Sequence, residues 1–227
     1  MKYTIDDGFN SELVKDAFFD GILEIPVIKK QNCHCDFKAM VPFTCRNRVD
    51  GKEEVLCFYE KDSAINDFTI HPEKYLGTIS KFSAVISPDN SLYWDMPLCL
   101  QIADIYFNRA IGQYLQQLGY FVIPNIRWGD ERTYTTCVLP EKVAFLGVEK
   151  HSVVAIGTYG QIHGAEAKKH FRQGLVAMLD ELEPEAVLVY GSNSKKVFEG
   201  LYNKTQFIFY KDWITSKKGG SLKNGNN

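Results

Sequence analysis

The sequence contains no long hydrophobic run. None of its apolar stretches approaches the ~20 residues that a membrane-spanning helix needs. The polar start, MKYTIDDGFN, lacks the apolar segment of a signal peptide. These two absences exclude membrane-spanning and signal-bearing classes, so we expect a soluble, cytoplasmic protein with no membrane partner.

Charge of one sign and cysteine are also scarce. A formal net charge of −2, with 24% charged and 45% hydrophobic residues, indicates neither disorder nor a surface that coats nucleic acid. Six cysteines are too few for a disulfide scaffold in 227 residues. This composition is typical of one globular domain, which we place at residues 1–214. A disordered tail rich in Lys, Gly and Asn is expected at 215–227.

Four residues have the chemistry of zinc ligands: Cys33, His34, Cys35 and Cys45. A Cys-x-Cys spacing without a second matching pair is not a zinc motif. Reduced, partly buried thiols are the simpler interpretation. No metal or cofactor is therefore assigned, and metal binding by these four residues stays an open question.

Short apolar runs alternate with helical patterns along most of the chain. The predicted strands lie at residues 22–28, 40–44, 55–59, 84–86, 120–126, 152–156, 186–190 and 206–210. The predicted helices lie at 62–82, split by a proline, and at 97–119, 164–182 and 191–202. Alternation at this spacing predicts an α/β fold with a mostly parallel sheet and right-handed helical crossovers.

Two architectures are compatible with this order of elements. If the strands at 22–28 and 40–44 join the others, eight strands could close a TIM-like barrel; otherwise the sheet stays an open, doubly wound, three-layer α/β structure. The barrel is favoured, because the link between Phe43 and Val55 is too short for a helix.

The helix at 97–119 has clear boundaries and a wide apolar arc. Pro97 opens it and Gly119 follows its end. We expect the arc to pack on the sheet. Its members are Leu100, Ala103, Phe107, Ala110, Ile111, Tyr114 and Leu118.

Polar residues gather where the predicted strands end. In parallel α/β proteins, ligands bind at the carboxyl ends of the strands. The candidates for acid–base catalysis or a metal carboxylate are Asp89, Asp95 and Asp130. The candidate ligand-binding residues are Arg109, Asn125, Arg127, Trp128, Thr158, Gly160, Tyr190, Gly191 and Ser192. The structural alternative is that Asp89 and Asp95 cap turns and that Arg109 packs its stem on the sheet.

Two loops have the character of phosphate-binding turns. Residues 157–164 and 191–195 each join an apolar strand to a helix start, where free backbone N–H groups favour an anion. Neither loop matches a Walker or dinucleotide motif, and a tight turn is the commoner reason for a glycine after a strand. For these loops alone the tight turn is the simpler interpretation, but together with the polar strand ends they lead us to prefer a small phosphorylated or nucleotide-like ligand as the partner.

The run SPDNSLYWDMP at residues 87–97, with Gln101, Asn108, Arg109 and Trp128, resembles the domain-of-unknown-function 4417 family. Later segments around Ser152 and Tyr190 extend the similarity to residues 22–210. At the position after the tryptophan, where the family motif has serine, this chain has Gly129. The resemblance implies a protein of bacteria, phages or mobile elements, and no established activity.

Two functional hypotheses follow from these observations. The preferred hypothesis is a phage or mobile-element protein whose strand-end pocket binds the phosphorylated ligand and could hydrolyse it; whether it is an enzyme is left open. The alternative is a non-catalytic accessory protein that binds a host protein or DNA. Either would act in the bacterial cytoplasm, which for a phage-encoded protein is that of the host. The oligomeric state is not predicted.

Overall fold

The computed structural model describes residues 10–32 and 35–216. Residues 217–227 of the predicted tail, the first nine residues, Cys33 and His34 lie outside these ranges. In the part of the chain that is described, no helix is long and apolar enough to cross a membrane.

In the described part of the chain, seven strands run parallel in two hydrogen-bonded groups. The first group is β3 (Ala39–Pro42), β4 (Glu54–Cys57), β5 (Ala84–Ile86) and β6 (Val122–Ile123), and the second is β7 (Val153–Gly157), β8 (Ala186–Tyr190) and β9 (Gln206–Tyr210). A parallel bridge between Asn125 and Ala155 joins the two groups, and the Ile126 N–H donates to the Ala155 carbonyl at 2.8 Å. Each strand therefore neighbours the one before it in the chain.

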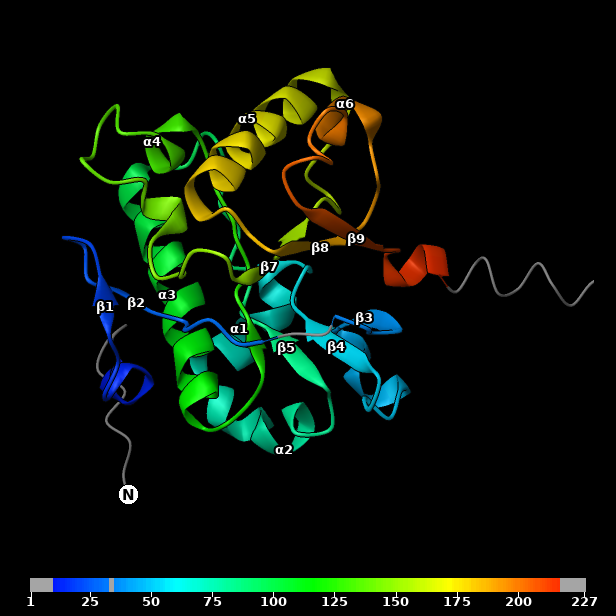
Figure 1. Ribbon diagram of the computed structural model, residues 1–227. Coiled ribbons are helices and arrows are strands. Elements are labelled where there is room, and N and C mark those ends of the chain that lie inside the picture. The colour runs from blue at the N-terminus through cyan, green and yellow to red at the C-terminus, as the bar shows by residue number, and fades with distance from the viewer. Residues whose placement is uncertain (1–9, 33–34, 217–227) are drawn as a thin grey trace, which may run out of the picture.

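Helices occupy the connections between these strands. They are η2 (Phe43–Arg48), α1 (Asp62–Ile70), η3 (Pro72–Tyr75), α2 (Leu76–Ile79), α3 (Leu98–Gln117), α4 (Glu131–Tyr134), η4 (Val143–Phe145), α5 (Gly164–Leu182) and α6 (Lys195–Phe198). Figure 1 shows α5 and α6 at the top, α3 at the left and α2 at the bottom, around the sheet. The α/β class and the helical crossovers predicted from the sequence are confirmed.

The sheet is strongly curled. The rings of Tyr59, just after β4, and Tyr190, at the end of β8, stack with centroids 5.3 Å apart. In a flat sheet with strands about 4.8 Å apart, four strand spacings would put them about 19 Å apart. Gly157 makes room for this contact, because a Cβ there would lie 2.4 Å from the Tyr59 ring. The inner face of the sheet thus packs against itself.

The segment at 22–28 does not supply an eighth parallel strand. Within it, β2 (Ile25–Pro26) pairs antiparallel with β1 (Phe19–Asp20), after the short helix η1 (Ser11–Val14), and contacts α3. Among the described strands, β3 and β9 are the two edges of the sheet. The short link after Phe43, correctly predicted to hold no α-helix, forms the 3-10 helix η2 and still returns the chain to a parallel partner.

Helix α3 lies where it was predicted, but only part of its predicted apolar arc is buried. Leu100 and Leu118, which we expected to face the sheet, are 49% and 48% exposed. Ala110 and Ile111 are buried as predicted, but the buried face also carries four polar residues, Gln101, Asn108, Arg109 and Gln113, beside Ile105 and Leu115. The prediction was wrong for Leu100 and Leu118 and missed the four polar residues, because polar groups of neighbouring loops bond to this helix.

Arg109 is the clearest example of a polar side chain on the buried face of α3 that bonds to neighbouring segments. Its side chain is buried, at 1% exposure, and donates to three backbone carbonyls: Nε to Leu146 at 3.0 Å, Nη1 to Asn125 at 2.7 Å and Nη2 to Ala144 at 3.0 Å. Burial lowers the pKa of Arg109 to about 10, so it stays protonated at neutral pH. The residue ties α3 to β6 and to η4.

Replacing this guanidinium should destabilise the fold. Arg109→Met leaves the three carbonyls without their donor, and we expect a loss of about 3–5 kcal/mol in the free energy of unfolding, measured by urea denaturation. The control, Arg48→Met, changes an exposed arginine and should shift the value by less than about 0.5 kcal/mol. A loss below about 1 kcal/mol for Arg109→Met would contradict this role.

Candidate functional site

An ion pair at the carboxyl edge of the sheet joins two predicted site residues. Asp89, three residues after β5, accepts from Arg127, just beyond β6, with 3.0 Å between Oδ2 and Nη1. The two residues are only 4% and 8% exposed. Parallel neighbouring strands bring these loops together, which confirms that both residues lie at one edge.

Asn125 holds the Asp89 side chain of this pair in place by hydrogen bonds. Its Nδ2 donates to Asp89 Oδ1 at 2.8 Å and to the Pro88 carbonyl at 3.1 Å, while its Oδ1 accepts from the Tyr59 hydroxyl at 3.1 Å. Burial raises the pKa of Tyr59 well above its ordinary value, so the hydroxyl keeps its proton. Burial also raises the pKa of Asp89, and Arg127 and Asn125 only partly offset this. The network sets the orientation of all four side chains.

Arg127 is only partly satisfied by this network. Its Nε and Nη2 are buried and have no hydrogen-bond partner within residues 10–32 and 35–216. Buried polar groups are almost always hydrogen-bonded in native proteins, so two free donors on one guanidinium need an explanation. These nitrogens are the most distinctive chemical feature of the edge.

Two further carboxylates, absent from the predicted set, lie near the pair. Asp62, at the start of α1, accepts from the Ser91 N–H and hydroxyl at 3.2 and 2.8 Å. Asp104, on α3, is half-buried; burial, followed by the charge of Asp62, raises its pKa to about 6, while the charge of Arg127 opposes the shift. Helical periodicity alone gave no signal for Asp104, because the predicted apolar arc of α3 was misplaced.

The other two predicted catalytic aspartates do not join this group. Asp95 is exposed. Asp130 caps α4, accepting from the Arg132 N–H and Nε and from Gln101 Nε2 at 2.8–2.9 Å. Its pKa is lowered because these bonds outweigh the opposing effect of burial. The arrangement gives Asp130 a structural task, which is to hold the end of the loop at residues 91–97.

The glycine-containing turns after β7 and β8 contact each other. Thr158 Oγ1 donates to the carbonyls of Tyr190 and Ser192 and accepts from the Ser192 N–H at 2.8 Å. Gly191 has a φ of +118°, and a Cβ there would lie 2.6 Å from the Thr158 hydroxyl oxygen. Gly160 is exposed. These bonds account for Thr158 and Gly191 by turn geometry, as the alternative interpretation of the loops proposed.

Trp128 lies on the outer side of the sheet, next to α5. Its ring packs against Phe171, with centroids 5.0 Å apart, and over Gly174, where a Cβ would lie 2.3 Å from the indole nitrogen. Trp128 also lines a half-open pocket of about 430 Å³ between the loop at 91–97 and the start of α5. The sequence indicated this tryptophan but not the pocket.

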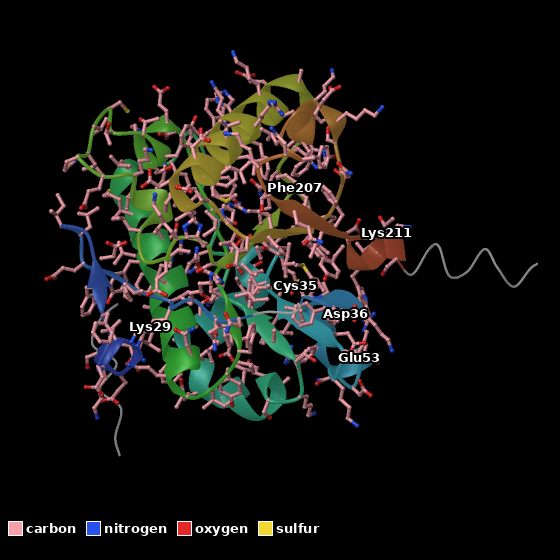
Figure 2. All side chains as sticks on the ribbon, in the orientation of Figure 1. Lys29, Cys35, Asp36, Glu53, Phe207 and Lys211 are labelled. Atoms are coloured by element: carbon pink, nitrogen blue, oxygen red, sulfur yellow. The ribbon has the colours of Figure 1, made fainter. Side chains whose placement is uncertain are left out.

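The candidate zinc ligands are only partly described. Cys35 and Asp36, which are labelled in Figure 2, are described. They line a surface pocket together with Val153, Ala186 and Ile208. Across residues 10–32 and 35–216, no three His, Cys, Asp or Glu side chains are grouped so that they could hold a metal ion.

Comparisons with known proteins find relatives among phage proteins. The chain is 31% identical over 136 residues to the Gene 1 protein of Mycobacterium phage L5, which covers 60% of this chain and 56% of that protein. It is 30% identical over 136 residues to the Gene 1 protein of Mycobacterium phage D29, covering 60% and 48%. The chain thus spans about half the length of the curated relatives it matches. No solved structure gives a significant match.

A family model matches a longer stretch of the chain than these relatives do. The model described as a domain of unknown function, DUF4417, matches residues 17–211 and so includes all seven parallel strands and the polar edge. Because the match covers most of the chain, this protein belongs to the DUF4417 family.

Proposed function

We propose that the carboxyl edge of the sheet binds a small phosphorylated ligand through Arg127. The observation that carries this proposal is the pair of free donors on a side chain that is only 9% exposed. Nε–H and Nη2–H lie along one edge of a guanidinium and together match two oxygens of a phosphate or carboxylate. An oxyanion there would supply the missing acceptors.

The surrounding network supports this role by holding the guanidinium still. Asp89 accepts a hydrogen bond from Nη1 of Arg127 and one from Asn125. Asn125 in turn accepts one from the Tyr59 hydroxyl. A side chain already held in its binding geometry loses little conformational entropy when a ligand arrives. Asp89 in this proposal positions Arg127 and is not the acid–base group, because each of its oxygens already accepts a hydrogen bond.

Asp104 is the carboxyl group best suited to proton transfer, should the ligand be hydrolysed. A pKa of about 6 lies close to the physiological range, whereas an ordinary aspartate is almost fully ionised there. Asp104 is near enough to feel the charge of Arg127. Neither Asp95 nor Asp130 has a part in the proposed site.

The first test is a titration with inorganic phosphate followed by NMR of the arginine Nε–H resonances. We expect a saturable shift of the Arg127 resonance. Arg127→Lys keeps the positive charge but lacks the two parallel donors, and it should bind phosphate at least about 10-fold more weakly in dialysis. The matched control, Arg48→Lys, alters an exposed arginine and should bind normally. An Arg127 resonance that does not respond, or equal binding by Arg127→Lys, refutes the proposal.

The second test uses pH. Above about pH 6, Asp104 is ionised and its charge, with those of Asp62 and Asp89, repels an anion near Arg127. The affinity for sulfate, which stays a dianion throughout, should therefore fall roughly 3- to 10-fold between pH 5 and pH 7. Asp104→Asn should flatten this dependence.

The same shift has a defined effect on stability. The folded chain holds the Asp104 proton up to about pH 6, whereas the unfolded chain loses it near the ordinary value of 3.8. This group therefore makes the free energy of unfolding decrease as the pH rises between these values.

A sulfate affinity that varies equally in the wild type and in Asp104→Asn would show that another group governs the pH dependence.

A further inference from the structure

The pocket beside Trp128 has walls made largely of aromatic rings. Its lining includes the rings of Tyr93, Trp94, Trp128, His163, His170 and Phe171. Trp94 is 62% exposed, and its ring lies nearly parallel to that of His170, at 14° with centroids 6.0 Å apart. A large aromatic face left open to solvent costs free energy unless it serves a contact.

The polar groups of this pocket differ from those at Arg127. Among the described residues, its lining contains no Lys or Arg, one carboxylate, Glu166, and two imidazoles, His163 and His170. Gln161 adds an amide, which can donate and accept at once. Such a lining suits an uncharged planar ring with hydrogen-bonding edges, and its carboxylate can accept from sugar hydroxyls.

We propose that this pocket binds the base and sugar of a nucleoside, with the base stacked on Trp94 and its edge at Gln161. A volume of about 430 Å³ lies within the range of small-molecule sites, about 300–1,000 Å³. Stacking on an aromatic side chain is worth about 1–3 kcal/mol for each base. The aromatic side chain of a peptide would also stack, and the experiment below includes it as a competing ligand.

The loop that carries Trp94 is held in place by hydrogen bonds to the carbonyl of Met96. The Met96 carbonyl accepts from Gln101 Nε2 at 2.8 Å and from Arg132 Nη2 at 2.9 Å, and Asp130 holds both donors. Asp130 is thus a positioning residue for the pocket, although it does not line it. This task suits its place at the start of α4 better than the predicted catalytic role.

The pocket and the Arg127 donors face different sides of the same strand end. Successive residues of an extended strand point to opposite faces. Trp128 packs outward with the helices, whereas Arg127 pairs with Asp89 inside the edge. The nucleoside proposal does not rest on Arg127, and the two sites can be tested with different probes.

The test is calorimetric titration of the full chain with adenosine, guanosine, cytidine and uridine, none of which carries a phosphate. We expect at least one nucleoside to bind saturably, and Trp94→Ala to weaken it about 5- to 150-fold, the range given by the loss of one stacked base. Phe18→Ala is the matched control, since Phe18 is 63% exposed and does not line the pocket. Melting curves check that each variant is folded, and Gln161→Leu, which keeps the stacking face, should change which nucleoside binds best.

The outcomes separate the two sites. Nucleoside affinity should be unchanged in Arg127→Lys and in the presence of inorganic phosphate, and the phosphate response should be unchanged in Trp94→Ala. Absence of binding by all four nucleosides overturns the proposal, as does equal binding by the wild type and Trp94→Ala. Tighter binding of N-acetyl-tryptophanamide than of any nucleoside would also overturn it and would assign the pocket to a peptide side chain.

Discussion

The residue on which most of the edge depends is Asn125. It lies opposite Ala155 in the bridge that joins the two groups of strands, where its neighbours Pro124 and Ile126 make the backbone hydrogen bonds. Its own carbonyl accepts from Arg109. Its N–H donates to the Ser87 hydroxyl at 2.8 Å, while its side chain bonds Tyr59 and Asp89. Every hydrogen-bonding group of this residue is used, so the continuity of the sheet and the orientation of the polar edge have one common support.

The two buried arginines differ in how many of their guanidinium nitrogens are hydrogen-bonded. This difference is the basis for giving Arg109 a structural role and for proposing a binding role for Arg127. All three nitrogens of Arg109 donate to carbonyls, which offsets the cost of burying its charge. Arg127 has an aspartate partner but keeps two donors free. From the sequence, both were ligand-binding candidates. The acceptors of Arg109 are backbone carbonyls in other segments of the chain, and no side-chain pattern reveals such acceptors.

The sequence was most informative where local chemistry decides the structure. The bounds of α5 were predicted to the residue, and Gly119 follows α3 with a φ of +86°, as a C-terminal glycine should. Asp89 and Arg127 were placed at one edge because parallel strands leave no other arrangement. Asp104 was not predicted, because its place near Asp62 and Arg127 depends on which loops pack together, and residue spacing does not encode this.

The order of the strands has a consequence for how the chain reaches its folded state. Each strand from β4 to β9 pairs with the strand made just before it, so its hydrogen-bonding partner already exists when it leaves the ribosome. The sheet can grow in one direction during synthesis, as domains emerging N-terminus first commonly do. Contact between Tyr59 and Tyr190 must wait until β8 has been translated. Curling of the sheet, and with it completion of the inner core, is therefore a late event in biosynthesis.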